Sequence, residues 1–290
     1  MRFGVHVNSG ASVTDALVLK DLGQLAEDLG FESILIGDHV VTARKINTQF
    51  PLPVENPPWH VYQEQDWPDC FVTLSFLAAY TKQVRLGMSV LILPYRHPAV
   101  VAKQIATLDR LSDGRVIFGV GIGWMKEEFG FLGVPFAERA AMSDEHVAVM
   151  KALWSGSQVN HTGRYVTINQ EVNFGPMPVQ KPHPPIWVGG NSLPALRRVA
   201  RWGDGWQPVY IPLPVIQQKM DQLRGLMDEQ KRDFNQLEIS SLAASYVTPK
   251  EVEAYQKAGI HTLYMFTTTD KPQELFAQMR QFARTLRGMA

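Results

Sequence analysis

GMSVLILPYRHPAVVAKQIATLDRLSDGRVIFGVGIG, residues 87–123, is the segment from which the architecture can be read most directly. Its ends, residues 87–93 and 116–122, are nearly continuous apolar runs, which is typical of strands buried on both faces of a parallel sheet. Between them, apolar residues recur at helical spacing from Val100 to Leu111, and Asp113-Gly114 turns the chain into the second strand. The segment therefore predicts a strand, a crossover helix and a second, parallel strand.

The same strand-then-helix pattern repeats along the whole chain. Apolar runs predict strands at residues 3–7, 33–37, 87–93, 116–122, 186–190, 205–209, 237–245 and 261–267. We expect a helix after each strand, and the first helix should have Thr14 as its N-cap and Gly30 just beyond its carboxyl end. Eight such units predict an α/β fold, a (β/α)8 TIM barrel that forms a single domain over residues 1–290.

Two long segments are expected to be insertions in the barrel, after strands two and four. Residues 42–68 are rich in proline and aromatic residues, and loops of this length in a compact domain usually have a function. Residues 157–185 combine a predicted hairpin through residues 161–164 with several prolines. The second segment is predicted to be an insertion and not a linker, because the strand at residues 186–190 follows at once.

The composition limits the possible functions. With 45% hydrophobic and 19% charged residues among 290, the chain can bury a substantial core. Lys+Arg and Asp+Glu both number 28, and this balance gives no reason to expect nucleic acid or an anionic membrane as a partner. The single cysteine, Cys70, excludes an internal disulfide. The amino terminus lacks the apolar core of a signal peptide and no apolar run could span a bilayer, so we expect a cytoplasmic protein.

Chemically distinctive residues follow several predicted strands at their carboxyl ends, where parallel α/β folds bind ligands. Asp38-His39 closes the second strand. A histidine can exchange protons near neutral pH, and a neighbouring carboxylate can set its tautomer, so His39 is a candidate catalytic residue and Asp38 its partner.

Two glycine motifs are candidates for close approach of a ligand. Gly119-Val120-Gly121-Ile122-Gly123 is not a G-x-G-x-x-G fingerprint, because the third glycine would fall at Trp124; its glycines are expected to let a flat ligand or a neighbouring strand come near. Gly189-Gly190-Asn191-Ser192 precedes a predicted helix, where exposed backbone N–H groups favour a phosphate. Arg197 and Arg198 could add positive charge there, and the alternative is an ordinary tight turn.

Other enzyme classes fit the sequence less well. A metal-dependent hydrolase needs several ligands at the strand ends, and His6 with His39 does not fill a coordination shell, so no metal is expected. The serine nucleophile motif G-x-S-x-G is absent from the sequence. For His97, both a role in the functional site and a purely structural role stay open. Structural roles are expected for the remaining histidines, namely His60, His146, His161, His183 and His261.

The chain resembles the bacterial luciferase-like flavin and deazaflavin oxidoreductases over nearly its whole length. The segments that carry this resemblance are RHPAVVAKQIATLDRLSDGRVIFGVGIGWMKEEF, GVPFAERAAMSDEHVAVMKALWSG and PPIWVGGNSLPALRRVARWGDGWQP. The pattern is most similar to the branch that uses the deazaflavin coenzyme F-420. The resemblance implies a TIM barrel with insertions, a cofactor ring across its carboxyl end, and a homodimer.

The resemblance also implies roles for particular residues. Asp38 and His39 match an Asp-His pair beside the deazaflavin and the substrate, in which Asp38 would either orient His39 or hydrogen-bond the ring. Ser89-Val90 matches a cis peptide that supports the ring from behind. Residues 189–192 match the phosphate-binding turn, and Gly121 is expected to lie against the cofactor. Trp124 stands where some deazaflavin enzymes have an acidic residue, so an acid, if used, would come from Glu127 or Glu128.

Three functions remain open from the sequence. The first is a deazaflavin-dependent oxidoreductase that moves a hydride to or from a small organic substrate. The second is an FMN-dependent monooxygenase that uses dioxygen, and the third is a non-catalytic protein that binds either cofactor. The expected pocket for the substrate contains Trp59, Tyr62, Trp67, Trp124 and Glu127.

Overall fold

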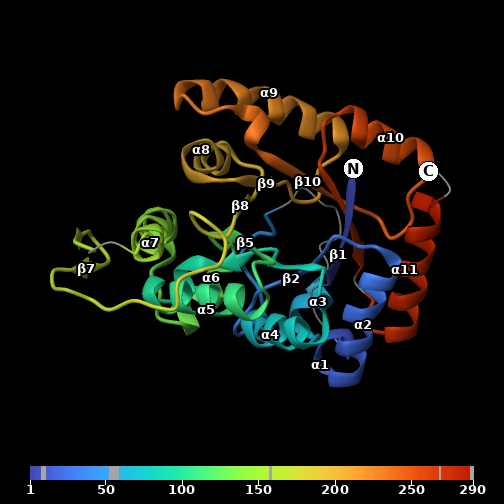
Figure 1. Ribbon diagram of the computed structural model, residues 1–290, viewed down its shortest axis with the longest axis horizontal. Helices are drawn as coiled ribbons and strands as arrows, with labels where there is room; N and C mark the ends of the chain where they lie inside the picture. Colours follow the sequence, from blue (N-terminus) through green and yellow to red (C-terminus); the bar gives the residue numbers. More distant parts are fainter. Residues whose placement is uncertain (8–10, 52–58, 157–158, 268, 288–290) are drawn as a thin grey trace.

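A computed structural model describes residues 1–7, 11–51, 59–156, 159–267 and 269–287 of the chain. In these residues eight parallel strand positions close into a barrel, and the helices surround it (Figure 1). The strands of the barrel are β1 (Arg2–Val7), β2 (Ser33–Ile36), β3 (Arg85–Met88) continued by β4 (Leu91–Ile92), β5 (Val116–Gly121), β8 (Ile186–Gly189), β9 (Gly205–Gln207), β10 (Glu238–Ala243) and β11 (Thr262–Thr267). The predicted (β/α)8 barrel is confirmed.

The third position of the barrel differs from the prediction, because the apolar run 87–93 is not one strand. β3 begins two residues earlier, at Arg85, and the peptide bond between Ser89 and Val90 is cis, so β4 starts only at Leu91. Both pieces pair with β5: Leu86 lies beside Val116 in the first, and residues 91–92 lie beside residues 120–121 in the second. The barrel therefore closes across a bulge located at its carboxyl end.

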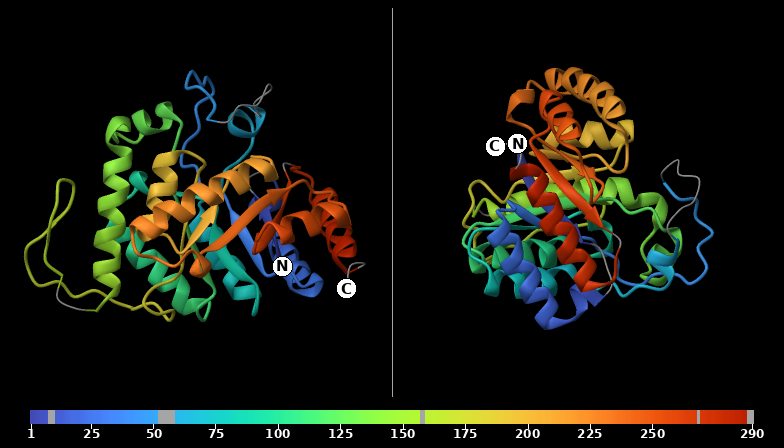
Figure 2. Two further views of the ribbon diagram at one scale, coloured as in Figure 1. Left: turned by 90° about the horizontal axis from the view of Figure 1, so that it is seen from above. Right: turned by 90° about the vertical axis from the view of Figure 1, so that its right-hand side faces the viewer.

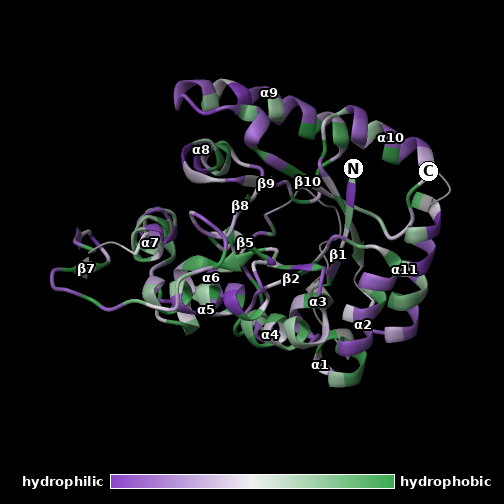
Figure 3. Cartoon of the chain, viewed as in Figure 1, coloured by the Kyte–Doolittle hydropathy of each residue, from purple (hydrophilic) through white to green (hydrophobic). Residues whose placement is uncertain are grey.

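The larger helices are α2 (Ala16–Leu29), α4 (Cys70–Tyr80), α5 (Pro98–Leu111), α7 (Arg139–Trp154), α8 (Leu193–Trp202), α9 (Leu213–Glu229), α10 (Pro249–Lys257) and α11 (Pro272–Arg287). Hydrophilic residues follow the outer turns of α9 and α11 (Figure 3), as expected for helices that bury one face against a barrel. None of the helices in the described residues is long and apolar enough to cross a membrane.

The first long helix begins differently from the prediction. Thr14 ends the short helix α1 (Ala11–Thr14), and the cap of α2 is Asp15, whose carboxylate accepts hydrogen bonds from the N–H groups of Leu17 and Val18. An aspartate can satisfy two free amides at once, which explains why the helix starts after it. The predicted end is confirmed, because Gly30 has the left-handed conformation (φ 78°).

Both insertions are present. After β2 the chain forms a loop and the short helix α3 (Trp59–Gln63), which stand at one end of the barrel, in blue and cyan in the left view of Figure 2. After β5 come α6 (Lys126–Phe131), α7 and a hairpin of β6 (His161–Thr162) and β7 (Thr167–Ile168). The hairpin lies beyond α7, away from the barrel (Figure 1), so of the two insertions it is the first that is placed to shape the barrel end.

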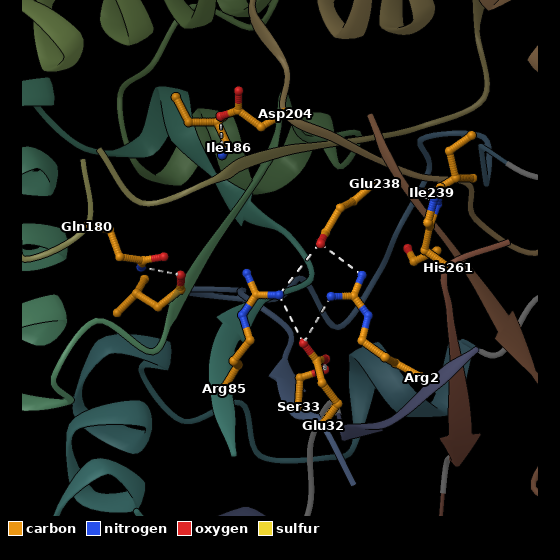
Figure 4. A network of polar contacts seen from close by, with 12 residues as sticks. Arg2, Glu32, Ser33, Arg85, Gln180, Ile186, Asp204, Glu238, Ile239 and His261 are labelled. Atoms are coloured by element: carbon orange, nitrogen blue, oxygen red, sulfur yellow. Dashed lines mark hydrogen bonds and ion pairs between the residues drawn. The ribbon is translucent and has the colours of Figure 1, made fainter. Parts of the chain in front are cut away.

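The amino end of the barrel is closed by an alternating set of charges (Figure 4). Arg2 is 2.8 Å from Glu238, and Arg85 is 2.9 Å from Glu32; the remaining pairs are 3.6–3.8 Å apart. All four residues lie at or just before the start of a barrel strand. Above them the interior is filled by a buried cluster of Leu35, Ile117, Trp187 and Tyr264. Because this end is filled, a ligand has access only from the carboxyl end.

Candidate active site

A cavity of about 360 Å³ opens at the carboxyl end of the barrel. Such a volume lies within the range of small-molecule and cofactor sites. The carboxyl ends of the barrel strands and the loops that follow them supply most of its surface. The lining includes His6, Asp38, His39, Phe50, Tyr62, Trp67, Ser89, Val90, Gly121, Trp124, Gly189, Gly190, Asn191, Ser192, Arg198, Gln207 and Tyr210.

His39 is held in the cavity by a buried carboxylate from another element. Its Nδ1 lies 2.6 Å from Oε2 of Glu128, which is in α6 and has no exposed surface. The other oxygen of Glu128 accepts the N–H groups of Val40 (2.6 Å) and Val41 (3.2 Å), and the Tyr95 hydroxyl donates to Oε2 at 2.9 Å. Glu128 therefore fixes both the His39 ring and the backbone that follows it.

This arrangement determines which nitrogen of His39 can exchange a proton. Burial opposes ionisation of Glu128, but the hydrogen bonds and charge of His39 and the N–H groups of residues 40 and 41 outweigh it and lower its pKa below 4.5. An ionised carboxylate only accepts hydrogen bonds, so Nδ1 carries a proton. The free position of the ring is therefore Nε2, which can accept a proton in the neutral form or donate one in the cationic form.

Asp38 does not orient His39. Its two oxygens accept hydrogen bonds from the guanidinium of Arg96 at 2.7 and 2.8 Å, and one of them also accepts the N–H of Ile92 at 2.9 Å. Its side chain is only 1% exposed. Of the two roles expected for Asp38, the orientation of His39 belongs to Glu128, and contact with a cofactor ring stays a prediction. In the structure Asp38 joins β2 to β4 and to the loop that contains Arg96.

Ser89 and Val90 form the bulge beneath the cavity, and the cis peptide expected there is present. The carbonyl oxygen of Ser89 is 3.2 Å from Nε2 of His6. A Cβ atom on Gly121 or on Gly189 would lie 2.3 or 2.6 Å from methyl groups of Val90. Of the two expected reasons for glycine at residue 121, the structure shows the approach of a neighbouring strand.

The turn at residues 189–192 is rigid and precedes helix α8. The Asn191 amide donates to the Val209 carbonyl at 2.6 Å and accepts the Val209 N–H at 2.9 Å, while Ser192 caps the helix through the N–H of Ala195. Asn191 thus holds the turn in shape instead of offering its side chain to a ligand. Pro194 has no N–H, so the backbone N–H groups ahead of it are the donors that this helix start can offer an anion.

The two arginines beyond this turn differ from each other. Arg197 is exposed, whereas Arg198 is 8% exposed, lines the cavity and is paired with Asp144, with 2.9 Å between Nε and Oδ1. Of the two arginines predicted to add charge, only Arg198 lies beside the cavity, and it shares the carboxylate of Asp144 with Arg201.

Four aromatic side chains line the cavity, and we call them the aromatic wall: Phe50, Tyr62 and Trp67 from the first insertion, and Trp124 from the segment between β5 and α6. The Trp67 ring meets His39 edge to face at 4.6 Å and stacks on Tyr62 at 5.7 Å. Trp124 contacts Tyr62 and Phe50, each at 5.4 Å. Burial raises the pKa of Tyr62 to about 12, so its hydroxyl stays neutral. The side chains of Trp59 and His60 lie outside the described residues.

Glu127, expected in the substrate pocket, instead points to the loop. Its carboxylate accepts the Thr48 hydroxyl at 2.6 Å and the N–H groups of Asn47 and Thr48 at 2.7 and 3.0 Å. It is not among the described residues that line the cavity. Glu127 therefore fastens the first insertion to α6, next to the residue that holds His39.

The sequence reasoning missed two polar residues deep in the cavity. Nδ1 of His6, and both amide atoms of Gln207, are buried and have no hydrogen-bond partner among the described residues. Burial lowers the pKa of His6 to about 4, against its bond to Ser89, so its ring is neutral. Buried polar atoms without partners are rare in native proteins. Both residues belong to the cavity lining, although these three atoms have almost no surface open to it. The described residues contain no cluster that could hold a metal ion.

Comparison with known proteins identifies the family. A family model described as luciferase-like monooxygenase matches residues 1–288. The chain belongs to this family. An uncharacterized protein of Mycobacterium tuberculosis is 33% identical over 195 residues, which cover 67% of this chain and 66% of that protein, just under two thirds of its length. An F420-dependent glucose-6-phosphate dehydrogenase of Microbacterium testaceum is 30% identical over 209 residues, which cover 71% of this chain and 56% of the dehydrogenase.

The fold has close counterparts among solved structures. The structure of an F420-dependent secondary alcohol dehydrogenase superposes with a TM-score of 0.80, covering 100% of this chain and 99% of the other at 16% identity. At this identity the likeness shows the fold alone. The family resemblance and the barrel predicted from the sequence are both confirmed.

Proposed function

We propose that the protein is a coenzyme F-420-dependent oxidoreductase that transfers a hydride to or from an organic substrate. The observation that carries this proposal is His39, whose Nδ1 is fixed by Glu128 so that Nε2 can exchange a proton in a cavity at the mouth of the barrel. A hydride transfer at a carbon bound to oxygen or nitrogen needs a partner for one proton, and a histidine in this position supplies it. The 30% identical relative named as F420-dependent supports the choice of cofactor.

The residues at the barrel mouth fit such a cofactor. The bulge at residues 89–90 offers a surface beneath a flat heterocycle, and His6 and Gln207 also belong to the cavity lining. The turn at residues 189–192 and the start of α8 would hold a phosphate. A bound deazaflavin would supply the hydride acceptor or donor, which no side chain of the protein can provide.

The protein's own residues would then bind, orient and protect the substrate. As an alcohol is oxidised, its C–H bond breaks with the electron pair leaving as hydride, and the hydroxyl proton moves to Nε2 of His39. Glu128 stabilises the cationic imidazole that results, because its carboxylate is 2.6 Å away in a buried setting. The aromatic wall excludes water from this exchange. In the opposite direction His39 returns the proton to the oxygen.

A second candidate is an FMN-dependent monooxygenase that uses dioxygen, which the name of the family favours. FMN is also a tricyclic ring with a phosphate, so the same cavity and turn suit it. A non-catalytic protein that binds one of these cofactors is the third possibility, and a fixed His39 with a free Nε2 gives no reason to prefer it.

Titration of the purified protein with F-420 and with FMN, each oxidised and reduced, separates these candidates. We expect binding of F-420, and His39→Ala should reduce turnover at least a hundredfold while cofactor affinity changes less than threefold. His161→Ala is the matched control, since His161 also faces a glutamate but lies in the hairpin beyond α7. FMN binding without F-420 binding would reverse the order of the candidates, and unchanged turnover in His39→Ala would remove His39 from the reaction.

A further inference from the structure

We propose that the site takes an uncharged substrate, one with a flat or bulky apolar body and a hydroxyl or carbonyl group, and that it rejects phosphorylated and carboxylate-bearing molecules. This inference rests on the proposed function, because it concerns the space between His39 and the aromatic wall. The proposed substrate differs in charge from glucose 6-phosphate, the substrate in the name of the 30% identical relative.

The first support is the surface that a substrate meets beside His39. The rings of Trp67 and Tyr62 pack around His39 with centroid distances of 4.6 and 5.4 Å. Trp124 and Phe50 extend this surface, each ring in contact with the next. The wall is thus assembled in advance, and it presents ring faces and edges that favour apolar groups.

The second support is that the charged side chains around the cavity already have partners. Asp38 is paired with Arg96, and Arg198 is paired with Asp144, which also pairs with Arg201. Glu128 is satisfied by His39, Tyr95 and two backbone N–H groups. Among the described lining residues, therefore, no unpaired lysine or arginine remains to receive a phosphate or a carboxylate beside the wall. An anion brought there would lose its hydration without gaining a counter-charge, which is strongly unfavourable.

The third support is the direction of the nearby polar groups. The carboxylate of Glu127 is committed to residues 47 and 48, so it offers nothing to the hydroxyls of a sugar. Tyr62 and Tyr210 both line the cavity, the ring of Tyr62 lies 5.4 Å from that of His39, and burial raises the pKa of both hydroxyls. A substrate with one or two oxygen atoms near His39 can form all of its hydrogen bonds there. A sugar with many hydroxyl groups would leave several of them without a hydrogen-bond partner.

The test compares pairs of ligands that share a body and differ in charge. Cyclohexanol against cyclohexyl phosphate, benzyl alcohol against benzoate, and glucose against glucose 6-phosphate are titrated by calorimetry into the full-length protein, with and without oxidised F-420. We expect cyclohexanol and benzyl alcohol to bind at least tenfold more tightly than their anionic partners, and neither sugar to bind better than cyclohexanol. Equal or tighter binding of the anions overturns the inference, and so does a failure of both uncharged apolar probes to bind.

Variants link this preference to the aromatic wall. Trp124→Ala should weaken binding of the uncharged probes about tenfold, while Trp124→Phe, which keeps a ring, should recover most of it. Tyr246→Ala removes an aromatic side chain that is 67% exposed and outside the cavity lining, and it should change nothing. If Trp124→Ala binds the probes as the unaltered protein does, the wall is not the binding surface and the inference fails.

The two proposals fail in different ways. A protein that binds no F-420 refutes the proposed function, yet the titrations without cofactor still show which charge the cavity prefers. A protein that binds F-420 and prefers anionic probes keeps its proposed function and loses the uncharged substrate.

Discussion

Replacing Glu128 by glutamine separates the charge of this residue from its shape. Glutamine has nearly the same size and can still accept the N–H groups of Val40 and Val41 with its oxygen. Its NH₂ group must then face Nδ1 of His39 and the hydroxyl of Tyr95, where the carboxylate now accepts two hydrogen bonds. An NH₂ group donates, so Nδ1 has to become an acceptor and the proton of the neutral ring moves to Nε2.

The size of the expected loss in kcat follows from the ability of Nε2 to accept a proton, which the variant loses. With a proton on Nε2, the ring cannot take the substrate proton, and the carboxylate that stabilises the imidazolium is gone. General base catalysis typically contributes 10²–10⁴-fold. We therefore expect kcat for substrate oxidation to fall about 10³-fold, equivalent to about 4 kcal/mol in the barrier. Charge-assisted hydrogen bonds become neutral ones, so the free energy of unfolding should fall by only about 1–3 kcal/mol.

Three measurements test this prediction. Steady-state kinetics should show the loss in kcat with KM changed less than threefold, and fluorescence titration should show an unchanged affinity for the cofactor. Nitrogen-15 NMR of labelled histidine should show the proton of His39 on Nδ1 in the unaltered protein and on Nε2 in the variant. A merely structural role for Glu128 would not move that proton.

Glu145→Gln is the matched control. Glu145 also accepts backbone N–H groups, those of residues 164–166, and lies 3.4 Å from a histidine ring nitrogen, but it does so in α7 beside the hairpin. Its variant should keep full activity. If Glu128→Gln keeps more than a tenth of kcat, or if His39 keeps its proton on Nδ1, the assignment of Glu128 as the residue that positions His39 is wrong.

Three further predictions concern stability, each measured by chemical denaturation. Gly119→Ala should lower the free energy of unfolding by about 3 kcal/mol, because its Cβ would lie 1.8 Å from the Met88 carbonyl oxygen. Gly130→Ala in α6, where the Cβ would meet open space, should instead raise the free energy of unfolding by about 0.5–1 kcal/mol. Equal effects of the two substitutions would contradict this prediction. Asp38→Asn should lower the free energy of unfolding by about 3 kcal/mol, since it leaves the Arg96 charge without a buried partner. A decrease of less than 1 kcal/mol would count against that pairing. The pKa of His6 falls from 6.5 to about 4 on folding, so the unfolded chain binds this proton more readily. The free energy of unfolding should therefore fall by on the order of 3 kcal/mol as the pH drops from 6.5 towards 4. His6→Asn should flatten that decline.

The barrel could be predicted because its signals are local and repeated. A strand buried on both faces is a short apolar run whatever surrounds it, and the helices that follow bury one stripe. Local capping was less certain, since both Thr14 and Asp15 are good caps and only the fold decides which N–H groups are free. The division of the third strand into β3 and β4 has no signature in hydrophobicity, because residues 87–93 are apolar on both sides of the bulge.

The site was predicted in part, and the reason lies in distance along the chain. His39 could be named because it follows a strand, and the barrel brings strand ends together. Its partner could not, because Glu128 is 89 residues away and is one of two adjacent glutamates. The turn of α6 sends Glu128 towards His39 and Glu127 towards Thr48, and the sequence shows no such difference between them. Asp38 was the more obvious partner for His39 in sequence, yet Arg96, from the loop between β4 and α5, occupies both of its oxygens.

The adjacent pairs at 38–39 and 127–128 together explain how a neutral cavity can hold a proton-transfer group. Neighbouring residues leave a strand end or a helix in different directions, so in each pair one member serves the site and the other fastens a loop. Asp38 and Glu127 fix the surroundings of the cavity, through Arg96 and through Thr48, while Glu128 lies against His39, the side chain that changes its charge in the proposed reaction. In that reaction Glu128 would balance the positive charge of His39 at Nδ1, and the rings of the aromatic wall carry no fixed charge. A site built in this way can hold an uncharged substrate and still exchange a proton with it, which is why the same contacts support both the proposed reaction and the proposed class of substrate.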